Sequence, residues 1–191
     1  MGRTAGRDAE ATRRLILDAA AEAILQDGPT ATIEQIAARA GVSKGGLLYH
    51  FASKNDLVEA LTRSLVLDFR EQVQAAVDPD DDAPGKLLRA YVRVEVDPNV
   101  DATMAQDRHM LETLLVTIPV VRRIWQEDDA WWEAALLADG VDVGLRDLVQ
   151  AAADGAWAAR GWGDSGPADR VTALRDRLLA MTRPRPSALR G

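Results

Sequence analysis

Helical periodicity runs through almost the whole 191-residue chain, and it restricts the fold more than any other feature. Apolar residues of the first segment recur at the spacing of one helix face: Ile16, Ala19, Ala20, Ala23 and Ile24. No segment alternates polar and apolar residues with the two-residue period of a strand. The pattern therefore predicts an all-α protein of about nine helices.

Capping and turn residues divide this pattern into separate helices. Thr32 and Gln35 form a capping box that begins the second helix, and Gly41 supplies a tight turn after it. Ser43 and Ser53 are the expected N-caps of the third and fourth helices. Later helices are expected at about 54–77, 85–96, 101–117, 119–138, 141–161 and 166–182.

Composition narrows the classes of protein that the chain can be. It has no cysteine, which excludes disulfides, thiolate metal sites and a cysteine nucleophile. It has no apolar run of membrane-spanning length and no hydrophobic signal segment, so we expect a cytoplasmic protein. The net charge of -7 is uneven, because residues 1–56 hold seven basic and seven acidic residues while residues 57–191 hold sixteen and twenty-three. The N-terminal part is therefore the relatively basic one, with Arg3, Arg7, Arg13 and Arg14 near its start.

The segment GVSKGGLLYHF (41–51) places two glycines inside an expected helix. Each glycine weakens a helix interior by roughly 1 kcal/mol relative to alanine, so the pair needs a reason. Three short helices with a glycine turn between the second and third have the layout of a helix-turn-helix. On the third helix, which would lie in the DNA major groove, Gly45 and Gly46 would let the backbone approach bases and phosphates. Lys44 would lie at its N-terminus, where phosphate is favoured.

The longer string TIEQIAARAGVSKGGLLYHFASKNDLVEAL resembles the DNA-binding segment of the TetR family of transcriptional regulators. The resemblance implies an all-helical homodimer whose C-terminal domain binds a small molecule and thereby releases a palindromic DNA operator. It places some residues near base edges or phosphates and others on the DNA backbone: Thr32, Ser43, Lys44 and Gly46 in the first group, and Tyr49, His50 and Lys54 in the second. Gly46 and Leu48 depart from the commonest family pattern, which leaves the operator sequence open.

These observations predict a helix-turn-helix DNA-binding domain at 1–53, a helical ligand-binding and dimerisation domain at 54–183, and a frayed tail at 184–191. The basic N-terminal stretch could reach the DNA minor groove, or it could be a solvated end.

All five tryptophans lie in the C-terminal part, with methionines and acidic residues near them. Flat aromatic area and adaptable methionines suit a cavity for a lipophilic compound, and acids beside aromatic rings suit a cation. The candidate ligand-binding residues are Met104, His109, Met110, Trp125, Trp131 and Trp157. The segment LVQAAADGAW is also similar to multidrug-binding members of the family. The alternative for these side chains is ordinary packing in the core.

The last two helices carry apolar stripes that could join two chains in a four-helix interface. The stripes consist of Leu145, Leu148, Val149, Ala152 and Ala156 in one helix and Val171, Leu174, Leu178 and Met181 in the other. The alternative is that both stripes pack inside one chain.

Two rival functions need consideration, an enzyme and a helical protein-interaction adaptor. The enzyme lacks support, because His50 and His109 are the only histidines and neither has a second histidine at metal-ligand spacing or a nucleophile beside it. We therefore expect no enzymatic activity, no cofactor and no bound metal. The phosphate-directed side chains argue against the adaptor. The favoured hypothesis is a two-state repressor in which ligand and DNA weaken each other's binding.

Overall fold

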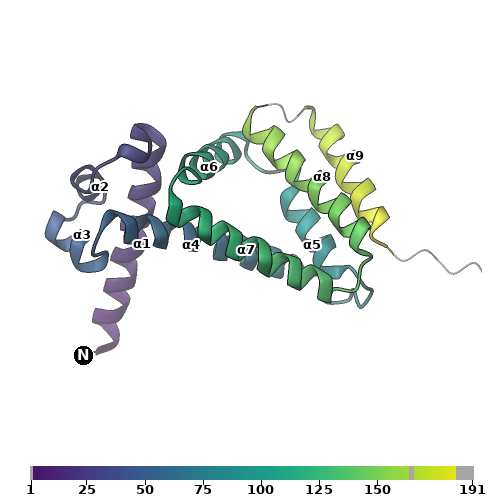
Figure 1. Ribbon diagram of the computed structural model, residues 1–191, viewed down its shortest axis with the longest axis horizontal. Coiled ribbons are helices and arrows are strands. Elements are labelled where there is room, and N and C mark those ends of the chain that lie inside the picture. Colours follow the sequence, from purple (N-terminus) through teal and green to yellow (C-terminus); the bar gives the residue numbers. More distant parts are fainter. Residues whose placement is uncertain (1, 164–165, 184–191) are drawn as a thin grey trace, which may run out of the picture. The chain divides into compact units, whose positions relative to one another are not determined.

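The computed structural model describes the backbone of residues 2–163 and 166–183, with side chains from residue 9 onward. Within these ranges the chain forms nine α-helices, one short 3-10 helix and no strand (Figure 1). The all-α prediction and its number of helices are confirmed. The predicted frayed tail at 184–191 and the side chains of Arg3 and Arg7 lie outside the described residues.

The helix boundaries follow the sequence pattern closely. The elements are α1 (Gly2–Asp27), the 3-10 helix (Gly28–Thr30), α2 (Ile33–Arg39), α3 (Lys44–His50), α4 (Lys54–Ala75), α5 (Lys86–Glu95), α6 (Ala102–Leu115), α7 (Pro119–Ala138), α8 (Val143–Gly161) and α9 (Ala168–Met181). From α4 onward every helix begins and ends within two residues of its predicted bounds. No helix in the described ranges is long and apolar enough to cross a bilayer.

The predicted caps form, and they fix where the short N-terminal helices begin. The Thr32 N–H donates to Gln35 Oε1 at 2.7 Å, and the Gln35 N–H donates back to Thr32 Oγ1 at 3.2 Å. Ser43 Oγ accepts the Gly46 N–H at 3.0 Å, and Ser53 caps α4 in the same way. Each cap satisfies an amide that the first turn of a helix leaves without a partner.

The chain divides into two compact units, each built from two separate segments. Unit 1 comprises residues 1–67 and 110–127, and unit 2 comprises residues 68–109 and 128–191. Helices α4, α6 and α7 each contribute residues to both units. The linear division after residue 53 stays a prediction.

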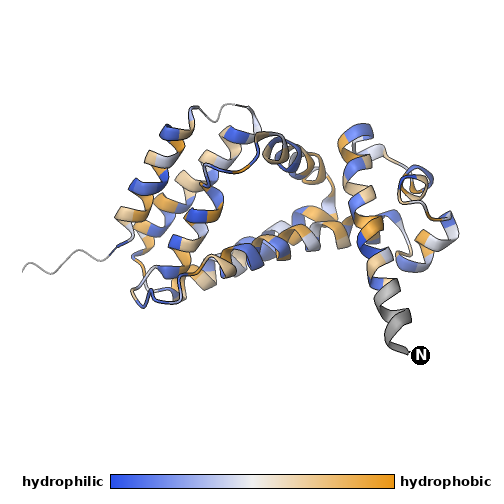
Figure 2. Ribbon diagram, turned by 180° about the vertical axis from the view of Figure 1, so that it is seen from behind, coloured by the Kyte–Doolittle hydropathy of each residue, from blue (hydrophilic) through white to orange (hydrophobic). Residues whose placement is uncertain are grey.

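The core of unit 1 is almost entirely aliphatic. The α1 stripe is buried as its spacing predicted, and hydrophilic and hydrophobic residues alternate around this helix (Figure 2). Leu47 and Phe51 hold α3 against the same core, with 0% and 3% of their surface exposed. The second segment of unit 1 completes this core with Leu111, Leu115 and Val121. Residues far apart in the sequence therefore support the α3 scaffold.

The core of unit 2 is centred on aromatic rings. Phe69, Tyr91 and Trp132 contact one another with ring centroids 5.1 to 5.6 Å apart. Trp132 is 4% exposed, so it packs in the core. Val149 and Leu178 from the two predicted association stripes are also buried in this core. Those stripes therefore pack largely inside one chain, the alternative left open above.

A buried arginine fastens the acidic connection before α5 to the end of α9. Arg89, which is 2% exposed, donates to both carboxylate oxygens of Asp81 at 2.7 Å. It also donates to the backbone carbonyls of Ala83 and Pro84 at 2.9 Å and of Thr182 at 2.8 Å. Hydrogen bonding to the Arg89 guanidinium lowers the pKa of the Asp81 carboxyl. Through Arg89, the C-terminal end of the segment before α5 is held to the residue that follows α9.

Candidate functional site

Helix α3 presents one face to the unit 1 core and the opposite face to solvent. Leu47 faces inward, whereas Tyr49 on the outer face is 85% exposed and Leu48 is 36% exposed. Ser43, Lys44 and Gly45 are exposed beside them. A large aromatic side chain with so little packing is free to contact a partner molecule.

The glycine pair has two different local settings. A Cβ on Gly45 would come no closer than 3.9 Å to another residue, so this position is open. A Cβ on Gly46 would lie 3.2 Å from Ser43 Oγ, the atom that accepts the Gly46 N–H. The missing side chain at Gly46 thus leaves room for the Ser43 cap of α3. The missing side chain at Gly45 leaves the outer surface of α3 without a protruding group, so that another molecule can approach the backbone.

Lys44 at the start of α3 has an acidic neighbour on α2. Its Nζ lies 2.6 Å from Glu34 Oε1, and both side chains remain about three-fifths exposed, at 58% and 61%. Hydrogen bonding to Lys44 lowers the pKa of the Glu34 carboxyl. Because the pair is in water, its strength is small, and Lys44 can exchange Glu34 for another anion.

Arg13 fixes the end of α3 instead of extending toward solvent. Its guanidinium donates to the backbone carbonyl of His50 at 3.2 Å and lies 4.3 Å above the centre of the Phe51 ring. This contact could not be predicted from local sequence patterns, because its partners lie 37 residues apart. The His50 ring is half-buried and meets Tyr49 edge-on at 5.3 Å.

The predicted DNA contacts do not all share the same surroundings. Four of them are exposed: Thr32, Ser43, Lys44 and Tyr49. Lys54 instead donates from Nζ to the backbone carbonyl of Pro29 at 2.6 Å and is half-buried. A DNA contact by Lys54 would have to replace or share that hydrogen bond.

The six predicted ligand-binding residues are divided between the two units. Trp125 and Met110 belong to unit 1, where Trp125 packs against the core. Met104 is 70% exposed, and Trp131 is 41% exposed with the Arg70 guanidinium 4.0 Å from its ring centre. The remaining two, His109 and Trp157, lie in unit 2.

Unit 2 contains aromatic rings together with a cation and carboxylates, as predicted for a ligand site. Most of the residues that supply them are not among the six predicted ligand-binding residues. The Arg108 guanidinium lies 5.4 Å from the ring centre of Phe69 and 5.3 Å from that of Trp157. The Tyr91 hydroxyl donates to Asp154 Oδ1 at 2.6 Å. No sequence signal pointed to Arg108. This environment already holds one cation between two rings.

Two carboxylates near these rings are shifted toward their neutral forms. Burial raises the pKa of Asp128, which is 5% exposed, although its ion pair with Arg70 opposes the shift. Asp154 keeps contact with solvent, yet loss of surrounding water raises the pKa of its carboxyl, against the hydrogen bond from Tyr91. Such carboxyls ionise more readily when a second cation arrives.

His109 occupies a packed position. Its ring meets Trp162 edge-on at 5.4 Å, and a Cβ on Gly161 would come within 2.4 Å of three of its atoms. Gly161 therefore allows α8 to approach α6 closely. Among the described residues, no three His, Cys, Asp or Glu side chains are grouped so that they could hold a metal ion.

Two family models match the chain in succession. The model described as bacterial regulatory proteins of the tetR family matches residues 16–61, which include α2 and α3. The model described as the tetracyclin repressor-like C-terminal domain matches residues 85–183, just over half of the chain. Their order is the order of helix-turn-helix and C-terminal domain expected from the sequence.

Similar proteins support the same assignment. An uncharacterised HTH-type transcriptional regulator, TtgW of Pseudomonas putida, is 40% identical over 74 residues, which are 36% of this chain and 55% of TtgW. The HTH-type transcriptional regulator BetI of Escherichia coli is 38% identical over 99 residues, which are 51% of this chain and 49% of BetI. The chain thus spans about half the length of these relatives.

A solved structure extends the similarity over nearly the whole chain. The multidrug binding protein EbrR, complexed with malachite green, is 28% identical and covers 90% of this chain and 98% of its own, with a TM-score of 0.69. Together with the two family models, the fold and the exposed face of α3, this similarity shows that the chain belongs to the TetR family of bacterial regulatory proteins.

Proposed function

We propose that this protein is a ligand-responsive transcriptional regulator that binds double-stranded DNA through α3. The observation that carries the proposal is the solvent-exposed face of α3, where Lys44 stands at the helix N-terminus and Tyr49 is 85% exposed. A helix N-terminus and a lysine both favour phosphate, and a tyrosine hydroxyl donates to phosphate oxygens. The default direction of regulation in this family is repression, and a DNA target implies action in the cytoplasm.

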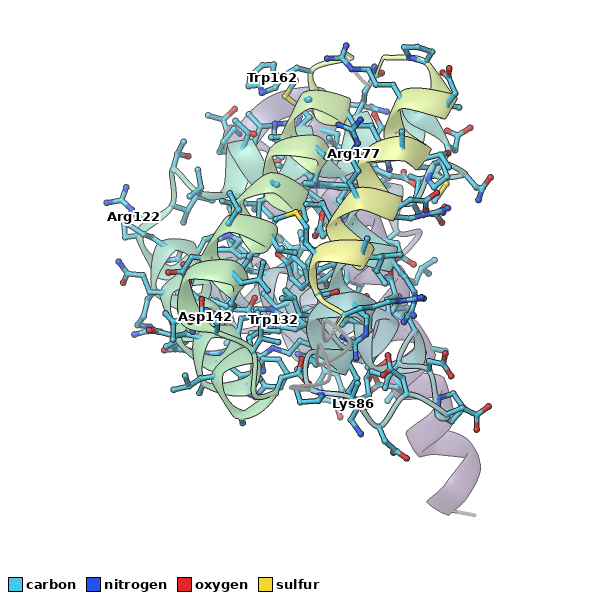
Figure 3. All side chains as sticks on the ribbon, turned by 90° about the vertical axis from the view of Figure 1, so that its right-hand side faces the viewer. Lys86, Arg122, Trp132, Asp142, Trp162 and Arg177 are labelled. Atoms are coloured by element: carbon cyan, nitrogen blue, oxygen red, sulfur yellow. The ribbon has the colours of Figure 1, made fainter. Side chains whose placement is uncertain are left out.

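Selection of short duplexes from a random DNA pool tests this proposal. We expect a palindromic sequence whose affinity falls steeply with salt, because binding releases counterions from the phosphates. Lys44→Ala should lower the affinity about tenfold and reduce the salt slope by about one. Lys86→Ala, an exposed lysine of α5 labelled in Figure 3, should change neither quantity. A folded protein that selects no duplex would contradict the proposal and favour the adaptor.

We infer that the active form is a homodimer joined through the outer faces of α8 and α9. With Val149 and Leu178 used inside unit 2, the faces left for a second copy include Leu148 and Met181, which are 57% and 43% exposed. Small residues on α8, Ala151 and Gly155, are exposed beside Leu148 and allow close approach. A two-fold dimer requires a pseudo-palindromic operator.

The proposed effector is a lipophilic aromatic cation bound in unit 2. EbrR, the similar protein described as multidrug binding, holds malachite green. In this chain, Arg108 shows that a cation fits between Phe69 and Trp157, and Asp154 lies in the same unit. We infer that an organic cation replaces the Arg108 guanidinium over these rings.

Binding of malachite green, with its uncharged leuco form as the matched compound, tests the effector class. The cation should bind and the leuco form should bind at least about fivefold more weakly, since a cation over aromatic rings gains about 1 kcal/mol or more. Arg108→Met should strengthen binding of the dye by removing its competitor. Equal binding of both compounds would show that charge is not recognised.

Effector and operator must then weaken each other by the same factor, because coupling between two binding sites is reciprocal. The change in DNA affinity at saturating dye should therefore equal the change in dye affinity at saturating operator. A factor of one in both measurements would show that the dye and the operator are not coupled.

A further inference from the structure

Two cations of unit 1 donate to backbone carbonyls at the two ends of the segment that contains α2 and α3. Lys54, the first residue of α4, donates from Nζ to the Pro29 carbonyl at 2.6 Å. Arg13 of α1 donates from Nη1 to the His50 carbonyl at 3.2 Å. Pro29 lies in the 3-10 helix before α2, and His50 is the last residue of α3. The two hydrogen bonds therefore connect the flanking helices, α4 and α1, to the beginning and the end of this segment (Figure 1).

Both carbonyls lie where a backbone acceptor needs a partner from elsewhere. The His50 carbonyl belongs to the last turn of α3, where the helix itself supplies no further N–H. A hydrogen bond from a charged donor is roughly twice as strong as one between neutral groups. Arg13 is held in addition by the Phe51 ring, which is 3% exposed and whose centre lies 4.3 Å from the guanidinium carbon. The two cations thus stabilise the positions of the turn before α2 and of the end of α3.

Their surroundings differ from those of the lysine at the start of α3. Lys44 is exposed and pairs with an exposed carboxylate, which a phosphate can replace at little cost. Arg13 and Lys54 are half-buried, and turning either one toward a phosphate would take a donor away from a backbone carbonyl. Arg13 and Lys54 are therefore better placed to hold α3 than to contact DNA.

We propose that Arg13 and Lys54 are positioning residues, which fix α2 and α3 for reading base edges and themselves contact no phosphate. This inference rests on the proposed function, in which α3 binds DNA. Base-edge contacts require a recognition helix that is held closely in place, whereas flexible basic side chains reach phosphate oxygens from a range of positions. Loss of either hydrogen bond should therefore lower the affinity for the operator and leave the affinity for unrelated duplexes nearly unchanged.

The first test measures affinity for the selected operator and for a random duplex of equal length, across salt concentrations. Arg13→Met and Lys54→Met should each lower operator affinity about tenfold, because the freed segment must be ordered again on binding. Affinity for the random duplex should change less than about twofold, and the salt slope should equal that of the wild type, since no phosphate contact is lost.

Two further variants calibrate this test. Lys44→Ala should weaken binding to both duplexes and lower the salt slope by about one, as expected for a phosphate contact. Arg63→Met is the matched control, because Arg63 is a cation of unit 1 that pairs with the side chains of Glu59 and Glu127. It should change neither the affinities nor the slope.

Conservative variants separate positioning from a general loss of stability. Lys54→Arg keeps a donor for the Pro29 carbonyl and should recover most of the operator affinity. Arg13→Lys keeps a donor for the α3 end but loses the planar group over the Phe51 ring, so it should recover less.

A second measurement uses no DNA. Gly45 and Gly46 lie in α3, and their amide NMR signals in protein carrying nitrogen-labelled glycine report the position and order of this helix. We expect both signals to shift or broaden in Arg13→Met and Lys54→Met, and to stay in place in Arg63→Met. Since neither hydrogen bond ends at a glycine, such a change shows that α3 itself has moved.

Three results would overturn the proposal. A salt slope lowered by about one in either methionine variant, with the glycine signals in place, would show that the cation contacts phosphate directly. A lower melting temperature with an unchanged ratio of operator to random-duplex affinity would assign the two cations to stability alone. Unmoved glycine signals in both variants would show that α3 does not depend on them. Failure to select any operator would instead contradict the proposed function, and the glycine signals would still test whether the two cations hold α3.

Discussion

The two units of this protein differ in whether they bury charged side chains. In the described part of unit 1, the only buried polar side chain is that of Thr62, and the charged residues lie at the surface. Unit 2 buries four charged side chains, those of Arg89, Asp128, Arg146 and Arg160. Unit 1 therefore keeps its ions in water, where Lys44 can exchange one anion for another at little cost. Unit 2 keeps its ions where the loss or gain of a partner changes the free energy strongly.

Of the variants that test this contrast, Arg89→Met is expected to have the largest effect on stability. It removes the donor for Asp81 and three backbone carbonyls, so the free energy of unfolding of unit 2 should fall by about 3–5 kcal/mol. Urea unfolding followed by tryptophan fluorescence measures the change. The control Arg175→Met removes only a pair with Asp176 and should stay within about 0.5 kcal/mol of the wild type. A loss below about 1 kcal/mol would show that burial does not make this cation important.

A smaller loss is expected from a cap in unit 1. Ser53→Ala removes the acceptor for the Asp56 N–H at the start of α4 and should cost about 1 kcal/mol in the same urea measurement. The exposed Asn55 in the first turn is the control, and Asn55→Ala should change stability by no more than about 0.5 kcal/mol. A cost as large as that of Arg89→Met would remove the distinction between the two units.

Glu34→Gln tests whether the surface pair of unit 1 competes with DNA. Without the carboxylate, Lys44 is available to phosphate, so operator affinity should rise about two- to fivefold at low salt, and the gain should shrink as salt increases. Glu133→Gln, exposed on α7 in unit 2, should leave affinity unchanged. An unchanged affinity for Glu34→Gln would place Lys44 away from the phosphates.

The smallest effect concerns the pH dependence of unit 2. The folded-state pKa of Asp154 is raised above its ordinary 3.8, so its carboxyl holds a proton in the folded protein after it has lost it in the unfolded one. Its stabilising contribution is complete below that value and is lost as pH rises through the folded-state pKa. Asp154→Asn, which keeps an acceptor for Tyr91, should flatten this decline in urea unfolding measured across pH. Tyr91→Phe removes the hydrogen bond that lowers the pKa and should extend the decline to higher pH; an unaltered profile in both variants would contradict the assignment.

The sequence predicted what depends on neighbours along the chain. Helix bounds, the Thr32 capping box and the buried stripe of α1 rest on spacings of a few residues, and all are confirmed. The family assignment followed from the same segment, because helix lengths and turn residues were all in register.

The rest depends on contacts between distant residues. Arg13 meets His50 across 37 positions and Arg89 meets Thr182 across 93, and nothing in local sequence separates these arginines from solvated ones. For the same reason, the tryptophans could not be sorted in advance: Trp132 is buried in the core, whereas Trp162 is 71% exposed.

The two-segment construction of unit 1 has a consequence for building hybrid regulators. If residues 1–67, the helix-turn-helix segment of unit 1, were excised alone, they would lose Leu111, Leu115 and Val121, three side chains of their own core. A chimera that grafts this segment onto another sensor must therefore also transplant residues 110–127, or redesign the recipient's matching segment to the same shape. Exchanging this unit between members of such a family therefore needs three junctions in the chain, after residues 67, 109 and 127, rather than one.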